Sequence, residues 1–232
     1  LWRRGAPELG LRMGWRMPAR PDGRLLWIHG ASNGEIASAR GVVDMALASD
    51  PRLQVLVTAN TATGRDLAQG WRLPRLAASL APFDLRGATR RFLDHWMPDG
   101  LIVIENEIWP NRMELCAARA LPVAVLGARM SERSARNWAR FPRLAARVFG
   151  AIGWISAQDA ASRQRLADLG VASARLGPVV TLKSAPDVAA NGVAGASALP
   201  WPRASTILAA STHDGEEAMI LDALAAARAE RP

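Results

Sequence analysis

The sequence predicts an α/β protein built around a doubly wound parallel sheet. Short apolar runs alternate with longer amphipathic runs, and the apolar runs are continuous, as expected for strands that are covered on both faces. Half of the 232 residues are apolar, which is enough to bury a sizeable core. The expected strands are 25–29, 53–58, 101–105, 122–127, 151–156 and 206–210.

Amphipathic patterns follow nearly every expected strand. Parallel strands need a crossover connection, and a helix is its usual form, so this alternation supports the parallel sheet. One further pattern, at 87–97, leads into the third expected strand. The expected helices are 34–48, 62–71, 87–97, 111–119, 132–148, 159–169 and 214–230.

The stretch 184–205 is rich in Ala, Gly, Pro and Ser and has no periodicity, which is typical of a linker. We therefore expect a first domain over 1–183 and the truncated start of a second α/β domain over 206–232. Both ends of the sequence look cut, since it starts on Leu1 and its last helical pattern has no domain behind it.

Composition argues against several classes of protein. The single cysteine, Cys116, excludes a disulfide framework, and three scattered histidines argue against a dedicated metal cluster. No apolar stretch is long enough to cross a bilayer, and the first residues have no signal-peptide core.

Charge indicates an acidic partner without identifying it. The formal net charge is +8, and every basic residue except Lys183 is arginine. Several arginines lie within the first 24 residues, with Trp2 and Trp15 among them, which suits an anionic membrane surface. A nucleic acid would fit the charge equally well.

In a doubly wound sheet, ligands bind at the carboxyl ends of the strands, so the loops there are the candidate site. The loop after the first strand spells G-x-S-x-G, from Gly30 to Gly34, and continues into Glu35. Ser32 is either a hydrolase nucleophile or an ordinary helix cap, with Glu35 in the first turn of the helix. The hydrolase hypothesis is the weaker one. The oxyanion donors of such enzymes normally come from a strand earlier in the chain, whereas here the motif follows the first expected strand. The helix N-terminus should keep Glu35 ionised and make it a weaker base.

The loops after the next strands are also polar. Residues 58–65 contain Thr61 and Arg65 at a helix start, where backbone N–H groups and a guanidinium could bind an anion. Residues 104–111 place Glu105 and Glu107 at the end of a strand, either as site residues or as acids that decorate a helix N-terminus.

Five stretches together carry a resemblance to a known family. They are WIHGASNGE, PFDLRGATRRFL, IENEIWPN, GARMSERSARN and ASTHDGEE, between about residues 8 and 222. In their order and content they resemble the 3-deoxy-D-manno-octulosonic acid (Kdo) transferase family. The resemblance implies the GT-B architecture, in which two Rossmann-like domains face a cleft. The first domain mainly binds the acceptor and the second mainly binds CMP-Kdo.

The resemblance also implies roles for individual residues. Glu35 is similar to the general base, and Glu105 and Lys183 are similar to transition-state stabilisers. The sequence departs from the family at 180–183, where the usual pattern is Gly-Asn-Leu-Lys, and Asn106 stands where Thr is usual. The residues expected to bind substrate are Ser32, Asn33, Gly34, Thr61, Arg65, Arg129, Ser211 and His213.

The implied reaction is an inverting, metal-independent transfer of Kdo from CMP-Kdo to the lipid A precursor, a phosphorylated and acylated disaccharide. No cofactor and no nucleic acid is expected. The implied location is the cytoplasmic face of the inner membrane, with peripheral or N-terminal attachment. Two alternatives stay open: an α/β hydrolase that uses Ser32, and a noncatalytic domain that binds anionic lipid. This chain alone is expected to bind without turnover.

Overall fold

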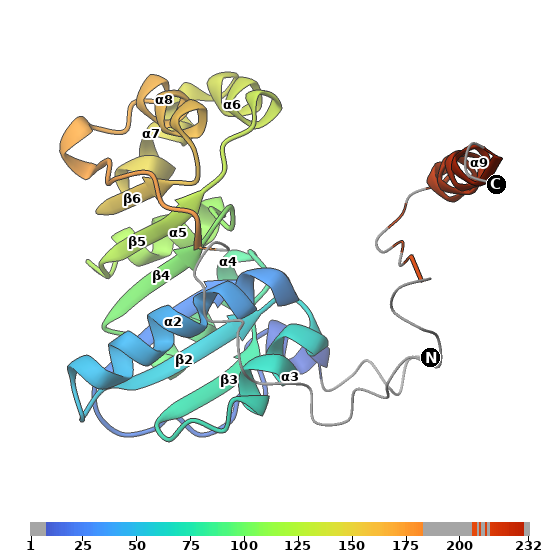
Figure 1. The fold of residues 1–232 in the computed structure, drawn as a ribbon. Coiled ribbons are helices and arrows are strands. Elements are labelled where there is room, and N and C mark those ends of the chain that lie inside the picture. Colours follow the sequence, from blue (N-terminus) through green and yellow to red (C-terminus); the bar gives the residue numbers. More distant parts are fainter. Residues whose placement is uncertain (1–7, 183–205, 208, 210–211, 213, 230–232) are drawn as a thin grey trace. The chain divides into compact units, whose positions relative to one another are not determined.

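The computed structural model describes residues 8–182, 206–207, 209, 212 and 214–229. Its centre is a six-stranded sheet in the order β3-β2-β1-β4-β5-β6, with every neighbouring pair parallel (Figure 1). The strands are β1 Leu25–Gly30, β2 Gln54–Ala59, β3 Leu76–Leu80, β4 Gly100–Ile104, β5 Val123–Ala128 and β6 Trp154–Ala157. This architecture confirms the predicted doubly wound α/β fold.

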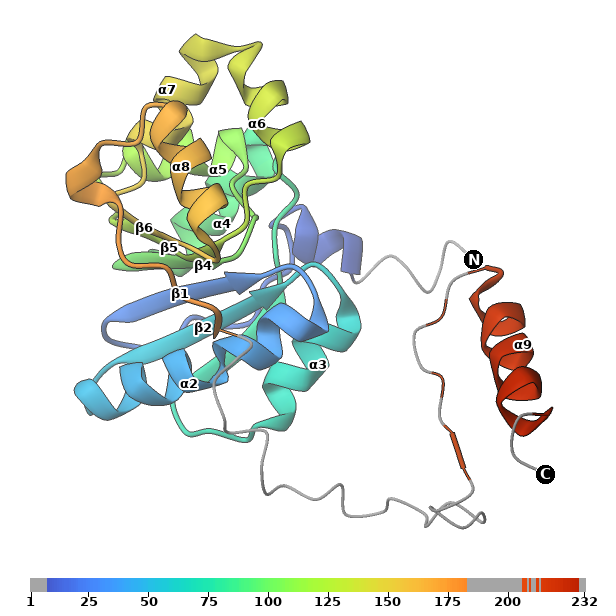
Figure 2. The ribbon, with the colours of Figure 1, turned by 45° about the horizontal axis from the view of Figure 1, so that its top comes forward.

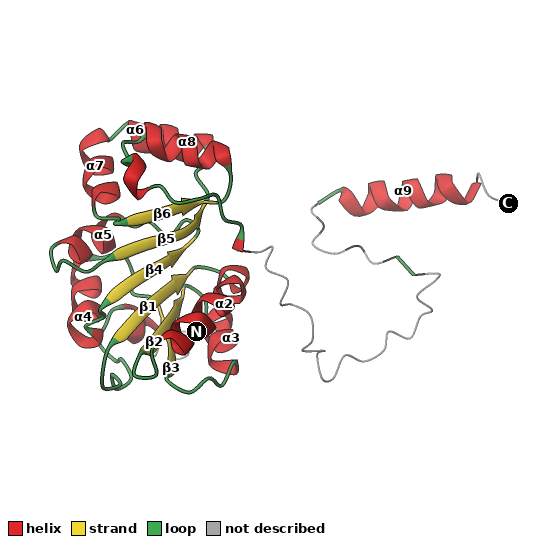
Figure 3. Ribbon diagram, turned by 60° about the vertical axis from the view of Figure 1, so that its left-hand side comes forward, coloured by secondary structure: helices red, strands yellow, loops and turns green. Residues whose placement is uncertain are grey.

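Helices cover both faces of the sheet. Within the first unit they are α2 Asn33–Ser49, α3 Ala62–Gly70, α4 Arg86–Trp96, α5 Pro110–Ala117, α6 Glu132–Ala139, α7 Pro142–Gly150 and α8 Ala160–Asp168. Helices α2 and α3 lie on one face of the sheet, whereas α4 and α5 lie on the other (Figures 2 and 3). The two faces bury separate apolar clusters, one around Ile28 and Val57 and the other around Trp27 and Phe92.

The helices that follow β1, β2, β5 and β6 begin at polar caps. The side chains of Ser32, Thr61, Ser131 and Asp159 each accept a hydrogen bond from a backbone N–H in the first turn of their helix. Capping satisfies donors that have no partner within the helix, so each helix starts directly after its strand. The hydroxyl-rich and acidic loops seen in the sequence therefore have a structural role as well as any functional one.

Two predicted elements differ in the structure. The strand β3 was missed, because two of the five residues of its sequence LAASL are alanine and none is β-branched, whereas β-branched residues are typical of a strand. The helix predicted over 132–148 is two helices, α6 and α7. Pro142 occupies the first turn of α7, where its missing N–H costs nothing, but the same residue could not continue α6.

The chain divides into two compact units, Leu1–Pro186 and Asp187–Pro232. Of the strand expected at 206–210, residues 206, 207 and 209 are described and lie outside any strand, and the others fall outside the described residues. The second unit contains α9, Glu216–Ala229, where a helix was predicted. Across the described parts of both units, no helix has the length and apolar character needed to span a bilayer.

The aromatic side chain of Phe92 should be a large contributor to stability. It is 1% exposed and packs its ring 4.7 Å from that of Trp27. We expect Phe92→Ala to lower the free energy of unfolding by about 3–5 kcal/mol, measured by urea denaturation. The same substitution at Phe141, which is 63% exposed, is the matched control and should cost below about 1 kcal/mol. Equal losses in the two variants would contradict this assignment of the core.

Candidate active site at the carboxyl edge of the sheet

The order of strands reverses between β1 and β4, and the loops that leave β1, β2 and β4 meet at this point. In register, Gly30 at the end of β1 pairs with Ala59 of β2, and His29 pairs with Val103 of β4. Such a switch point is where α/β sheets bind ligands, because the two flanking loops turn to opposite faces. Glu35, Asn60 and Glu107 come from these three loops.

Glu35 is half-buried in the first turn of α2. Its Oε2 accepts a hydrogen bond from Ala31 N at 2.7 Å, and Ser32 Oγ lies 3.3 Å from Oε1. Burial raises the pKa of Glu35, and the charges of Glu105 and Glu107 raise it further, against the lowering effect of the Ala31 and Ser32 hydrogen bonds. The expectation of a weakened base was therefore wrong, because desolvation outweighs the hydrogen bonds that Glu35 accepts from Ala31 and Ser32.

The glycine at the end of β1 makes room for this carboxylate. A Cβ at Gly30 would lie 3.1 Å from Glu35 Cβ and 3.2 Å from Ile36 Cδ1. The first Gly of G-x-S-x-G therefore permits close packing of Glu35 against the strand end. Ser32 is the helix cap, and its hydroxyl accepts from Glu35 N at 3.3 Å.

The hydrolase hypothesis gains no support from this geometry. A nucleophilic serine needs a base within hydrogen-bond reach, normally an imidazole. Within the described residues no imidazole hydrogen-bonds Ser32: His29 contacts Thr58 and Glu107, and His95 contacts the Pro18 carbonyl.

Glu107 connects its own segment to β1 and to the loop after β2. Its Oε2 accepts hydrogen bonds from Asn60 Nδ2 at 2.8 Å, from Trp109 Nε1 at 2.7 Å and from His29 Nε2 at 3.4 Å. Burial alone would raise the pKa of Glu107, but these hydrogen bonds outweigh it and lower the pKa to about 2. The carboxylate is therefore ionised and fully engaged in positioning its neighbours.

A buried chain of hydrogen bonds leads to Glu107 from the core. Trp27 Nε1 donates to Thr58 Oγ1 at 2.7 Å, and Thr58 Oγ1 lies 2.9 Å from His29 Nδ1. Nδ1 also lies 3.1 Å from Thr58 O. The carboxylate of Glu107 accepts only, so it favours the neutral Nε2–H tautomer, in which Nε2 donates to Glu107 and the Thr58 hydroxyl can donate to Nδ1. Burial, with the nearby charge of Arg112, lowers the pKa of His29 to about 4, which agrees with a neutral ring.

Glu105 has an unusual backbone. Its φ is 58°, a left-handed conformation that costs a residue with a side chain of the order of 1 kcal/mol or more. The turn is held by Glu105 N, which donates to Leu126 O at 2.9 Å, and by Asn106 Oδ1, which accepts from Arg129 N at 2.9 Å. Strain of this kind is concentrated at functional sites, and here it places a second acidic residue within electrostatic reach of Glu35.

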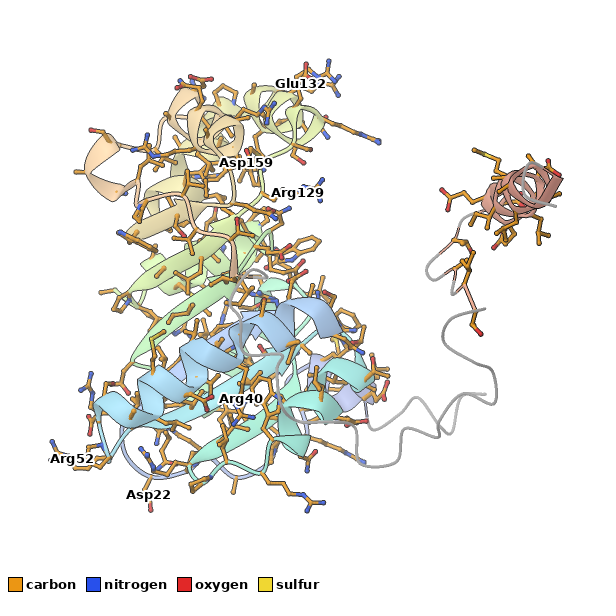
Figure 4. All side chains as sticks on the ribbon, viewed as in Figure 1. Asp22, Arg40, Arg52, Arg129, Glu132 and Asp159 are labelled. Atoms are coloured by element: carbon orange, nitrogen blue, oxygen red, sulfur yellow. The ribbon has the colours of Figure 1, made fainter. Side chains whose placement is uncertain are left out.

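The structure brings some of the expected substrate-binding residues together. Asn33 Oδ1 accepts from Thr63 Oγ1 at 3.0 Å and lies 3.4 Å from Thr61 Oγ1, so the loops after β1 and β2 are joined beside Glu35. Gly34 is exposed in the same turn. Arg129 is linked to the Glu105 loop through its backbone, and its side chain projects away from the ribbon (Figure 4).

Other expected residues are not part of this group. Arg65 pairs with its neighbour Asp66 at 2.7 Å and lines a separate hollow with Arg16. Lys183, Ser211 and His213 lie outside the described residues. No three His, Cys, Asp or Glu side chains of the described segments form a group suited to a metal ion.

Sequence reasoning missed the contributions of His29 and Asn60, and it left Glu107 as either a site residue or an acid at a helix N-terminus. The apolar context of WIHG made the histidine look like part of a strand, and Asn60 looked like an ordinary turn residue. The two glutamates in IENE were the available sign of a site at this loop. The sequence does not indicate which of the two carboxylates accepts hydrogen bonds from neighbouring residues. That difference arises from contacts between residues 47 and 78 positions apart.

A parallel sheet of this strand order, with polar loops gathered at its switch point, defines a Rossmann-like ligand-binding domain. The chain belongs to the family described as 3-deoxy-D-manno-octulosonic-acid transferase (kdotransferase), whose profile matches residues 8–185.

Curated relatives agree with this membership. The 3-deoxy-D-manno-octulosonic acid transferase of Bordetella pertussis is 33% identical, over 99% of this chain and 54% of its own length. The Haemophilus influenzae transferase of the same name is 30% identical, over 91% of this chain and 50% of its own length. The chain thus spans about half the length of these relatives.

Among solved structures, UDP-GlcNAc 2-epimerase from Neisseria meningitidis, bound to UDP-GlcNAc, is 14% identical. Its TM-score is 0.48, over 69% of this chain and 47% of that chain. The UDP-N-acetylglucosamine 2-epimerase from Rickettsia bellii is also 14% identical, with a TM-score of 0.44, over 67% of this chain and 44% of that chain.

The lowered pKa of His29 predicts a pH dependence of stability. Between the ordinary value of 6.5 and about 4, the unfolded chain holds a proton on this ring that the folded chain lacks. Stability should therefore fall as the pH drops through this window, by up to roughly 1.4 kcal/mol per pH unit. Glu107, whose pKa is lowered, adds a further loss only below about pH 4.5.

Urea denaturation from pH 7 to 5 checks this, and His29→Gln should flatten the curve. An NMR titration in which the His29 ring protonates near pH 6.5 would contradict the neutral, buried assignment.

Ser32 should not react as a nucleophile, since its hydroxyl caps α2 and no imidazole of the described residues contacts it. Incubation with a fluorophosphonate, followed by mass spectrometry of the peptide that contains Ser32, should show no adduct, while an authentic serine esterase in the same reaction is labelled. Stoichiometric labelling that disappears in Ser32→Ala would restore the hydrolase hypothesis.

Proposed function

We propose that the protein containing this chain transfers Kdo from CMP-Kdo to the lipid A precursor, with Glu35 as general base. The observation that carries the proposal is a half-buried carboxylate of raised pKa at the switch point of a domain that the transferase profile covers. A base works best when its pKa approaches the operating pH, and the raised pKa moves Glu35 in that direction.

The carboxylates at this edge have different properties, and the difference supports the choice of Glu35. The pKa of Glu107 is lowered to about 2 by three donors that share one oxygen, so this carboxylate is a poor proton acceptor and a good anchor. The pKa of Glu35 is raised instead. Neighbouring titratable groups whose pKa values are pushed apart are a guide to acid and base roles.

In the proposed step, Glu35 accepts the proton of an acceptor sugar hydroxyl while the hydroxyl oxygen attacks the anomeric carbon of Kdo. The bond from that carbon to the CMP phosphate breaks, CMP leaves with the electron pair, and the anomeric configuration inverts. Glu105 contributes a negative charge near the positive charge that develops on the sugar. Lys183 is proposed to offset the charge of the departing phosphate. The step needs no metal and no cofactor.

The proposed acceptor is a phosphorylated, acylated disaccharide, so the enzyme must work at a membrane surface. The arginines and tryptophans of the first 24 residues suit an anionic interface. We place the protein at the cytoplasmic face of the inner membrane, attached peripherally or by an N-terminal segment. The CMP-Kdo site belongs mainly to a second domain of the GT-B architecture, which starts near residue 206 and extends beyond this chain.

Glu35→Gln is the direct test, in a full-length transferase that contains this domain. Loss of the base should lower kcat by about 100-fold to 10 000-fold, measured as Kdo transfer to the lipid A precursor. Binding of the acceptor should change little, because the amide keeps the shape of the side chain. Glu132→Gln is the control and should leave kcat unchanged, since Glu132 is exposed on α6 (Figure 4). A Glu35→Gln enzyme with normal turnover would refute the assigned base.

The isolated chain of 232 residues should bind acceptor without turnover, because most of the proposed donor site lies beyond it. A sensitive transfer assay with radiolabelled Kdo should detect no product. Measurable transfer would show that this domain is sufficient for the chemistry.

A further inference from the structure

A pocket of about 420 Å³ opens beside the candidate site, on the side of Asn60. Its lining includes Asn60 after β2, Phe83 and Asp84 after β3, and Trp109 and Arg112 at the start of α5. Arg12, from the segment that precedes β1, completes it. The Asn60 side-chain amide also donates to Glu107, so the pocket and the candidate site share a residue.

Arg112 is a buried cation without a hydrogen-bonded counter-charge. It is 2% exposed, and its Nε and Nη1 have no hydrogen-bond partner among the described residues. Its guanidinium lies 5.4 Å from the ring centroid of Trp27, a favourable contact that satisfies none of those donors. Burying a charge without a partner is costly, so the position calls for an anion.

Arg12, which also lines the pocket, likewise contacts an aromatic ring and has a buried N–H group without a partner among the described residues. Its Cζ lies 4.4 Å from the ring centroid of Phe83, and its Nη1 donates to Asn60 O at 3.1 Å. Its Nε is buried and has no partner among the described residues. Two guanidinium groups, each held against an aromatic ring, therefore line one pocket with N–H donors to spare.

Two of the acidic side chains nearby, Asp84 and Glu107, are engaged elsewhere. Asp84 accepts hydrogen bonds from the backbone N–H groups of Asn111 and Arg112, which caps the start of α5. Glu107 accepts from its three donors in the neighbouring loop. Glu107 influences both arginines through space, Asp84 also influences Arg112, and the exposed Glu8 also influences Arg12. Within the described residues neither arginine has an ion pair within 4 Å.

The outer rim of the pocket is apolar. Phe83, Leu85 and Trp109 are 37%, 54% and 45% exposed. An arginine-lined interior with an apolar rim matches a molecule that carries a phosphate next to hydrocarbon.

We propose that this pocket binds a phosphate monoester group of an amphiphilic ligand, with its apolar part against Phe83, Leu85 and Trp109. Two guanidinium groups can direct several N–H donors to the oxygens of one phosphate, and desolvation strengthens these charge-assisted bonds. The inference rests on the proposed function only in identifying that ligand as the acceptor. Binding would then fix the acceptor in the pocket next to the segments that hold Glu107, after β4, and Glu35, in α2.

The test measures binding by isothermal titration calorimetry on the 232-residue chain at low ionic strength. Dihexanoyl phosphatidic acid, below its micelle concentration, is the main probe, and dihexanoyl phosphatidylcholine and inorganic phosphate are the comparison probes. We expect phosphatidic acid to bind, phosphatidylcholine to bind at least about tenfold more weakly, and inorganic phosphate to bind weakly but at the same site.

Arg112→Met and Arg12→Met should each weaken phosphatidic acid binding by about tenfold or more. Arg112→Met should also keep or raise the stability to urea, because it removes an uncompensated buried charge, so lost binding would not reflect lost folding. Arg143→Met, at an exposed position on α7, is the matched control and should bind as the unaltered chain does.

Equal affinity for the phosphatidic acid and phosphatidylcholine probes, or unaltered affinity in both Arg112→Met and Arg12→Met, would overturn the proposal. Loss of inorganic phosphate binding in the same variants would place recognition at the phosphate itself. Glu35→Gln should bind phosphatidic acid normally. Failure of this pocket would therefore leave the assigned base intact, and an active Glu35→Gln transferase would leave the pocket intact.

Discussion

The carboxylate of Glu107 is the interaction on which the rest of the site depends. A single oxygen accepts hydrogen bonds from His29 of β1, from Asn60 after β2 and from Trp109 at the start of α5. It links the segment after β4 to β1 and to the loop after β2, which are far away in sequence. The hydrogen bonds keep this carboxylate ionised, and its charge in turn contributes to the raised pKa of Glu35. Glu107 thus positions its neighbours through hydrogen bonds and also contributes to the raised pKa of Glu35.

Much of the fold could be predicted because the signals are local. Continuous apolar runs marked five of the six strands, and polar caps marked the helix starts, since both depend on neighbours in sequence. The strand Leu76–Leu80 carries no such signal and owes its conformation to pairing with β2. The break at Pro142 could have been found, because proline inside a helical pattern is a known stop.

The candidate site could be located from sequence but not resolved in detail. Glu35 and Glu105 stand out as acids after strands, and the edge of the sheet follows from the α/β pattern. The direction of the Glu35 pKa shift could not be predicted, since it depends on burial and on the charges of Glu105 and Glu107 in space. Arg112 looked like an ordinary helix residue among many arginines. Its burial and its contact with the ring of Trp27 in the folded chain show that it is enclosed.

The left-handed backbone at Glu105 has a consequence for the future of this sequence under selection. Glycine adopts a φ of 58° without the steric cost of a Cβ. Selection for thermal stability alone should therefore favour glycine at this position. The resulting proteins would be more stable and would lose, in the same substitution, an acidic group at the carboxyl edge of the sheet. A chain that keeps glutamate at this position retains both the backbone strain and the acidic group.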